Sequence, residues 1–192
     1  MFLLDIIAPK KCIKCQKIGN YLCKTCLEEI WYHEDICYIC KQKSKNFKTH
    51  WYCENDHTYF KQILILTHYK NFNIKYLIKQ AKFHHKFEIF DDFAKYLVTL
   101  LQNNLDTPKS QIILIPTPMF FLKKLWRWYN QAEILTKKIA KYWNYEYNSK
   151  ILKKIKHTKS QSHLSKTQRI VNLSNSFKVN QKRGIYRAGK WY

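Results

Sequence analysis

The chain has 192 residues, of which 46% are hydrophobic, enough for one ordinary domain and a smaller module. Its 35 Lys and Arg residues and 13 Asp and Glu residues give a formal net charge of +22. No apolar run approaches the length that spans a bilayer, and the first residues lack a basic leader and a cleavage site of small residues. We therefore expect a cytoplasmic protein without membrane insertion.

The positive charge is concentrated in the second part of the chain. Residues 1–58 hold nine basic and seven acidic side chains, whereas residues 59–192 hold 26 and six. No acidic residue follows Glu146. This asymmetry favours a polyanionic partner such as single-stranded nucleic acid. The alternative is a lysine-rich coding bias that produces ordinary solvated faces.

All seven cysteines lie within the first 53 residues, in pairs separated by two residues. Three pairs are Cys-x-x-Cys and the fourth is His-x-x-Cys, so eight ligands are present, enough for two tetrahedral sites. An odd cysteine count and the lack of a secretory signal argue against disulfides. We predict two structural zinc ions held by Cys12, Cys15, Cys23, Cys26, Cys37, Cys40, His50 and Cys53. The spacing leaves open which pairs share an ion, and His57 is an alternative to His50.

Beyond the cysteines, strand and helix periodicities alternate, which predicts an α/β sheet whose ligands bind at the carboxyl ends of the strands. The expected elements are a strand at 61–69, helices at 73–82 and 87–101, a buried strand at 111–116, a basic aromatic loop before residue 130, a helix through 132–143, an extended segment at 145–155 and a short helix near 165–172. The adjacent acids Asp91 and Asp92 fall inside a helical pattern, so we interpret them as a solvated helix face. No catalytic triad or Gly-rich phosphate loop can be assembled.

Several short motifs, taken in order, resemble the ComF family of competence-associated proteins, which are related to type I phosphoribosyltransferases. The motifs are Thr49-His50-x-x-Cys53, Gln80-Ala81-Lys82-Phe83, Ile115-Pro116-Thr117-Pro118, the segment RWYNQA at 127–132, and the spaced residues Thr158, Gln161, Leu164, Arg169, Asn172 and Phe177. The resemblance covers nearly the whole chain. It implies a double zinc-knuckle module at 1–58 followed by a phosphoribosyltransferase-like α/β domain at 59–192.

The resemblance also implies a role in handling single-stranded DNA during uptake, with competence-machinery proteins such as a helicase among the expected partners. Basic and aromatic residues in the second part of the chain suit such a strand, because bases stack on aromatic rings while lysines follow phosphates. The expected substrate or nucleic-acid contacts are Pro116, Pro118, Lys123, Lys124, Arg127, Asn130, Gln131, Lys153, Lys154, Gln161, Arg169 and Asn172.

One departure from the family pattern concerns catalysis. Type I phosphoribosyltransferases hold the ribose phosphate of phosphoribosyl pyrophosphate with an Asp-Asp-x-x-Thr-Thr-Gly loop, which in the family follows the position matching Phe177. That motif does not occur in this sequence. We therefore expect a domain truncated before this loop, without catalytic residues or turnover. The alternatives are an active phosphoribosyltransferase and a zinc-dependent protein-interaction module without nucleic-acid affinity.

Trp128 stands where the family motif RGFNQA has glycine. The chain has 3 glycines and 6 tryptophans, whereas average usage predicts about 13 glycines. Two hypotheses follow. In the first, Trp128 and other tryptophans such as Trp51 and Trp143 are UGA codons that the source organism reads as glycine, as some bacterial lineages do. In the second, Trp128 is a true stacking platform beside Arg127.

Overall fold

The computed structural model describes residues 9–29, 34–55, 60–83, 86–161 and 164–180. Its elements are α2 (Lys24–Glu28), the 3₁₀ turns η1 (Lys45–Phe47) and η2 (Trp51–Cys53), α3 (Phe72–Phe83), α4 (Ile89–Asn104), the 3₁₀ turn η3 (Lys109–Gln111), β1 (Ile113–Leu114), α5 (Phe121–Arg127), α6 (Gln131–Trp143), β2 (Glu146–Tyr147), β3 (Leu152–Lys154), α7 (Lys166–Leu173) and β4 (Phe177–Val179).

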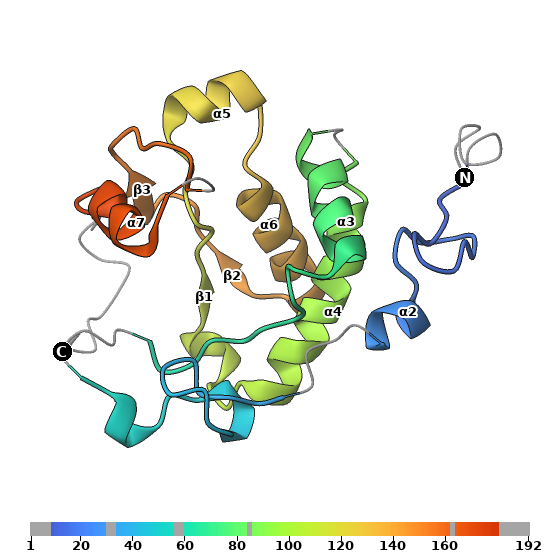
Figure 1. The fold of residues 1–192 in the computed structure, drawn as a ribbon, viewed down its shortest axis with the longest axis horizontal. Coiled ribbons are helices and arrows are strands. Elements are labelled where there is room, and N and C mark those ends of the chain that lie inside the picture. Colours follow the sequence, from blue (N-terminus) through green and yellow to red (C-terminus); the bar gives the residue numbers. More distant parts are fainter. Residues whose placement is uncertain (1–8, 30–33, 56–59, 84–85, 162–163, 181–192) are drawn as a thin grey trace.

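The helices α4 and α6 pack against each other along their lengths, and α3 lies beside them (Figure 1). Apolar residues recur along α4 at helical spacing and form its buried face. Part of that face, Ala94 and Val98, packs against Ile139 and Trp143 of α6. These helices occur close to where the periodicity predicts them, because long amphipathic patterns are the clearest signal in a sequence.

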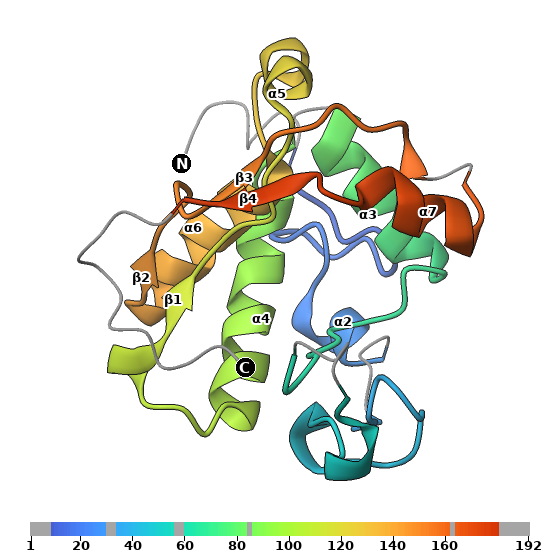
Figure 2. The ribbon, with the colours of Figure 1, turned by 90° about the vertical axis from the view of Figure 1, so that its left-hand side faces the viewer.

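Two small sheets complete the described part of the fold. β1 and β2 are parallel, with Ile113 opposite Glu146, and β3 and β4 are antiparallel. β1 connects to β2 through α5 and α6, which is the crossover that parallel strands require. Figure 2 shows β1 and β2 beside α6 and α4. The predicted mixture of helices with a small sheet is confirmed at this level.

Three predicted extended segments are wrong in extent. The buried strand predicted at 111–116 is reduced to β1, whose two residues are half-buried, and Ile115 after it is exposed. In the segment 61–69, Gln62 forms an isolated bridge with Lys48, and none of these residues belongs to one of the strands β1 to β4. The segment 145–155 divides into β2 and β3, because the side chain of Asn148 accepts a hydrogen bond from the amide of Lys150 at 2.8 Å and turns the chain. A β-rich pattern indicates an extended backbone but does not supply a partner strand.

The basic aromatic loop predicted before residue 130 is also wrong, since seven of its residues form α5. Leucine and lysine favour the helical conformation, and this preference suffices for two turns. None of the residues of α5 is buried. The helix lies at one end of the molecule, and η1 and η2 lie at the other (Figures 1 and 2).

The predicted boundary between residues 58 and 59 lies outside the described residues. The parts of the chain before and after this boundary contribute to one buried core. Cys12, Leu22 and Cys26 belong to the same buried cluster as Leu77 of α3 and Phe90 of α4. The first half of the cysteine-rich segment is therefore packed onto the larger domain.

Trp128 ends α5 with φ 67° and ψ −12°, the left-handed conformation that glycine adopts at many helix ends. Its side chain is 87% exposed. Trp51 and Trp143 have negative φ, and Trp143 is buried in the core. The backbone at Trp128 thus suits glycine, whereas Trp143 packs as tryptophan. The codon hypothesis itself stays a prediction.

We predict that Trp128→Gly raises the free energy of unfolding by roughly 0.5–1 kcal/mol. A left-handed residue with a side chain costs about 1–2 kcal/mol, which exceeds the entropic cost of about 0.5–1 kcal/mol for ordering glycine. The matched control is Trp126→Gly within α5, where the helical backbone gives glycine no advantage and stability falls. Urea unfolding of both variants is the measurement, and equal destabilisation by the two would contradict the prediction.

Candidate metal centres and basic cavity

The Cys-x-x-Cys pairs that begin with Cys12 and Cys37 form the same turn. The amide of Gln16 donates to the carbonyl of Cys12 at 2.9 Å, and the amide of Lys41 donates to that of Cys37 at 2.9 Å. Gln16 and Lys41 each have φ 63°. Antiparallel bridges flank both turns. Each turn bends its two thiols toward one point, which is the geometry that a metal knuckle needs.

Consecutive pairs combine into two groups of four ligands. The first cluster is Cys12, Cys15, Cys23 and Cys26, and the second cluster is Cys37, Cys40, His50 and Cys53. The ligand atoms of each cluster lie within 4.8 Å of one another. A tetrahedral zinc with Zn–S bonds of about 2.3 Å places its sulfur ligands roughly 3.8 Å apart. Cys15 Sγ and Cys23 Sγ are 3.6 Å apart, so the donor set fits such an ion.

This geometry resolves the pairing that the sequence left open, since neighbouring pairs share a site and do not interleave. His57 lies outside the described residues. His50 occupies the predicted position, with Nδ1 3.3 Å from Cys40 Sγ. Its Nε2 lies 3.1 Å from the carbonyl oxygen of Lys43. Nδ1 therefore faces the metal position, while an Nε2–H donor to the carbonyl fixes the ring.

The acidity of the thiols shows why each cluster suits a cation. Burial acts to raise the pKa of Cys12 and of Cys37, but hydrogen bonds from backbone N–H groups in the same cluster outweigh it and lower the pKa of both to about 6. Burial, followed by the neighbouring thiols, raises the pKa of Cys26 to about 12 and that of Cys53 to about 11. A divalent cation removes this conflict because it stabilises all the thiolates together.

The two clusters have different surroundings. The first contributes Cys12 and Cys26 to the core formed with α3 and α4, and the amide of Tyr21 donates to Asp92 of α4 at 3.2 Å. The second is attached to the extended segment after it: the amide of Thr49 donates to the carbonyl of Lys61 at 2.8 Å. The first cluster is therefore part of the domain core, and the second is peripheral.

We predict about two zinc equivalents per chain and about one in each of the variants Cys26→Ser and Cys53→Ser, because each cluster needs four ligands. Both substituted thiols are buried, so the variants are matched in burial. Cys26→Ser is expected to expose the amides of α3 and α4 to hydrogen exchange, whereas Cys53→Ser leaves them protected. Similar exchange in α3 for both variants would contradict the difference between the clusters.

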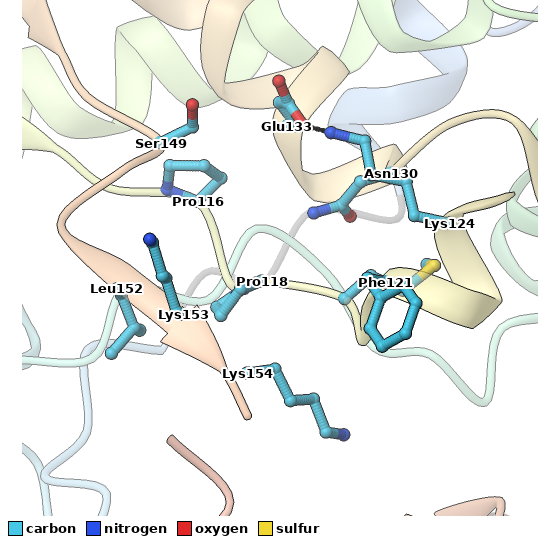
Figure 3. Close-up of a pocket in the computed structure, with 11 residues that line it drawn as sticks. Pro116, Pro118, Phe121, Lys124, Asn130, Glu133, Ser149, Leu152, Lys153 and Lys154 are labelled. Carbon is cyan, nitrogen blue, oxygen red and sulfur yellow. Dashed lines mark hydrogen bonds and ion pairs between the residues drawn. The ribbon is translucent and has the colours of Figure 1, made fainter. Parts of the chain in front are cut away.

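A cavity of about 230 Å³ lies where β1 ends, between α5, the start of α6 and β3 (Figure 3). Its walls combine two prolines, several lysines and a single carboxylate. The lining residues are Pro116, Pro118, Met119, Phe121, Lys124, Asn130, Glu133, Ser149, Leu152, Lys153 and Lys154. The cavity thus gathers six of the predicted substrate or nucleic-acid contacts: Pro116, Pro118, Lys124, Asn130, Lys153 and Lys154.

Asn130 fixes the wall between β1 and α6. It is buried and caps α6, since its Oδ1 accepts the amide of Ala132 at 3.1 Å. Its Nδ2 donates to the carbonyl of Thr117 at 3.0 Å. The asparagine of the NQA motif therefore joins the P-x-P segment to the helix, and the cap and the cavity depend on the same side chain.

Glu133 lies on the first turn of α6 and forms ion pairs with Lys124 and Lys137, both at 3.0 Å. Burial acts to raise the pKa of Glu133, but the hydrogen bonds from the two ammonium groups outweigh it and hold the pKa below its usual value. Glu133 therefore stays ionised, and Lys124 and Lys137 share its single negative charge. Because Lys124 is paired in this way and Lys154 donates to the hydroxyl of Thr158, Lys153 is the lining lysine most available to a ligand in the cavity.

Lys123 lies beside the cavity and not in its lining. Its Nζ donates to the carbonyl of Thr158 at 2.8 Å, while Lys154 Nζ donates to the hydroxyl of Thr158 at 2.7 Å. Burial, and then the charge of Lys123, lowers the pKa of Lys154. Two ammonium groups thus converge on one buried threonine, which adds to the positive potential at this end of the molecule.

The remaining predicted contacts lie elsewhere. Arg127 extends toward α3, with its guanidinium 5.7 Å from the ring of Phe83. Gln131 has a buried Oε1 without a hydrogen-bond partner. Arg169 and Asn172 of α7 hold the preceding loop, because Arg169 Nε donates to the carbonyl of Gln161 at 3.1 Å and Asn172 bonds to Lys159. The structure does not bring these residues into the cavity, and their contact with a ligand stays a prediction.

Sequence reasoning missed five residues that form the cavity: Met119, Phe121, Glu133, Ser149 and Leu152. Glu133 carries a weak signal, since it is the only acid among many cations around the NQA motif. Ser149 and Leu152 have none, because they join the site only through the turn between β2 and β3. Thr158 was noticed as a motif position, but its contact with two lysines depends on the fold.

Comparison with known proteins gives one informative match. The chain is similar to Competence protein F of Haemophilus influenzae, with 26% identity over 180 residues that cover 92% of this chain and 72% of that protein. No family model and no solved structure matches the chain. The similarity and the two cysteine clusters support a ComF-like protein with a competence-related role. None of the described helices is long and apolar enough to cross a membrane.

Proposed function

We propose that this ComF-like chain binds single-stranded DNA during uptake, through the basic surface formed by residues 120–180, on a domain related to phosphoribosyltransferases. The observation that carries the proposal is the cavity at the end of β1. It joins Pro116 and Pro118 to Asn130, from two separate motifs shared with the family, and adds Lys153 and Lys154 from a third segment. Phosphate groups are the ligands that such a site suits best.

The electrostatic field supports a strand and not only a small phosphate ligand. Residues after Glu146 carry no carboxylate, so the positive charge of β3, α7 and β4 has no local counterion from that segment. Aromatic side chains are exposed near the cavity, with Phe121 59% and Trp126 78% accessible. A polyanion of stacked bases complements both features, because lysines bind its phosphates and exposed rings bind its bases.

The cysteine clusters act as structural elements in this proposal. Zinc at the first cluster would hold the Cys12 turn against α3 and α4, and α4 supports α6. A helicase or another competence protein as partner, and a cytoplasmic location, are expectations from the family resemblance. The peripheral second cluster is the part of the cysteine-rich segment with the more accessible surroundings for such a contact, because Trp51 and Tyr52 beside it are exposed.

The alternative of an active phosphoribosyltransferase draws its support from the position of the cavity at the carboxyl end of a parallel strand. The acidic loop that binds ribose phosphate in the family has no counterpart in the sequence. Both residues of the Asp-Asp pair make structural contacts. Asp91 accepts a hydrogen bond from Lys138 Nζ at 2.7 Å, and Asp92 accepts one from the amide of Tyr21. We therefore propose binding without turnover.

Binding of single-stranded DNA is expected to weaken steeply with salt. If roughly four phosphates are neutralised, the logarithm of the association constant falls with the logarithm of the salt concentration with a slope of about −3. The double variant Lys153→Gln/Lys154→Gln should lower the affinity, while the control Lys75→Gln/Lys79→Gln on exposed α3 positions should not. Fluorescence anisotropy with a labelled oligonucleotide measures both. A flat salt dependence, or equal losses in the two double variants, would reject the proposal.

The chain is expected to release no pyrophosphate from phosphoribosyl pyrophosphate in the presence of any common nucleobase. The physical reason is that the Asp-Asp pair of this sequence is not available to hold the ribose hydroxyls, since Asp91 and Asp92 make structural contacts from α4. A coupled pyrophosphate assay on the zinc-loaded protein measures this. Turnover that is lost in Asn130→Ala would instead establish the enzymatic alternative.

A further inference from the structure

The register of β3 and β4 places two lysines directly opposite each other. Lys153 pairs with Lys178 across the antiparallel ladder. Side chains at such positions lie on the same face of the sheet, and like charges there destabilise it. Within the part of the chain that the structure describes, neither lysine has an ion-pair partner. An anion bound at this face would remove the repulsion.

Lys153 is also the lysine of β3 that extends toward the end of β1. Figure 3 shows its side chain directed toward Pro116, with Ser149 beside that proline. Lys124, on the opposite wall, is already paired with Glu133 at 3.0 Å. The lysine of β3 that points toward this end of the cavity is therefore Lys153, since Lys154 Nζ donates to the hydroxyl of Thr158 at 2.7 Å. Lys178, opposite Lys153 in the ladder, adds a second charge on the same face of the sheet.

The size of the cavity limits what it can hold. Its volume of about 230 Å³ is below the range of about 300–1,000 Å³ that is typical of pockets for drug-sized ligands. A phosphate group with part of its sugar fits this space, whereas a run of stacked nucleotides does not. The bulk of a bound strand must therefore lie outside the cavity, over the exposed surface, with one phosphate inside.

We propose that this cavity binds the terminal phosphomonoester of a single strand, with Lys153 as its direct contact. The inference rests on the proposed single-strand binding and names the part of the strand that enters the cavity. A phosphomonoester carries a charge of about −1.5 to −2 at pH 7, which matches Lys153 and Lys178, the two lysines that face each other across β3 and β4. An internal phosphodiester carries a single charge, so it compensates only one of these two lysines.

The test compares three homothymidine oligonucleotides of equal length, with a 5′-phosphate, a 3′-phosphate or hydroxyls at both ends. One of the phosphorylated strands is expected to bind about tenfold more tightly than the hydroxyl-ended strand, the effect of roughly one additional charge-assisted hydrogen bond. The phosphorylated oligonucleotide with the higher affinity identifies which end of the strand enters the cavity. Equal affinities would overturn this inference and leave single-strand binding intact, whereas no binding of any strand would overturn both.

Lysine variants test which side chains cause the higher affinity for the phosphorylated strand. Lys153→Gln is expected to bring the affinity ratio of phosphorylated to hydroxyl-ended strand close to one, and Lys178→Gln to reduce it. The matched control is Lys156→Gln, an exposed lysine after β3 that does not line the cavity, and it should keep the tenfold ratio. Because the readout is a ratio within each protein, a general loss of affinity does not imitate the result. A full ratio in Lys153→Gln would overturn the assignment.

Discussion

The packing of the first cysteine cluster against α3 and α4 is the contact on which the rest of the structure depends. Cys12 and Cys26 are buried together with Leu77 and Phe90, so ligands of the candidate metal are also core residues. The segment that carries them contains one helix of five residues, α2, which is too short to be stable alone. Its turn at Gln16 takes a left-handed conformation that costs energy. The domain core stabilises this arrangement through the buried cysteines, and a cation bound by the four ligands would stabilise it further.

Contacts between α4 and α6 connect the first cysteine cluster to the cavity. Asp91 at the start of α4 receives Lys138 of α6 at 2.7 Å, which fixes the two helices along their shared face. α6 begins at Asn130, whose side chain also bonds to the segment after β1. The position of the cavity wall therefore follows from helix packing that begins at the cysteine cluster. A loss of metal at the first cluster would reach the cavity through these contacts. The segment of the second cluster instead contacts the far end of α4, where Lys48 pairs with Asp106 and Gln62 donates to the carbonyl of Asn104.

The acidic and basic side chains have different roles in this arrangement. The acids that the fold uses are few and each holds two elements together: Asp92 binds the amide of Tyr21, Asp106 pairs with Lys48, and Glu133 pairs with Lys124. The segment beyond Glu146 has no acidic side chain that could join two elements in this way. Lysines at β3 and β4 consequently face each other without compensation. The surface that results is stable only because water and counterions screen it, and a polyanion displaces those counterions favourably.

The sequence alone determined the features that depend on local spacing. Paired cysteines indicated the eight metal ligands, and apolar periodicity indicated α3, α4 and α6, because both patterns arise within a few residues of the chain. Only the tertiary structure decided which cysteine pairs combine and that Ser149 and Leu152 line one cavity with Pro116. Those outcomes depend on contacts between distant segments, and a strand or a cavity wall has no partner until the rest of the chain has folded around it.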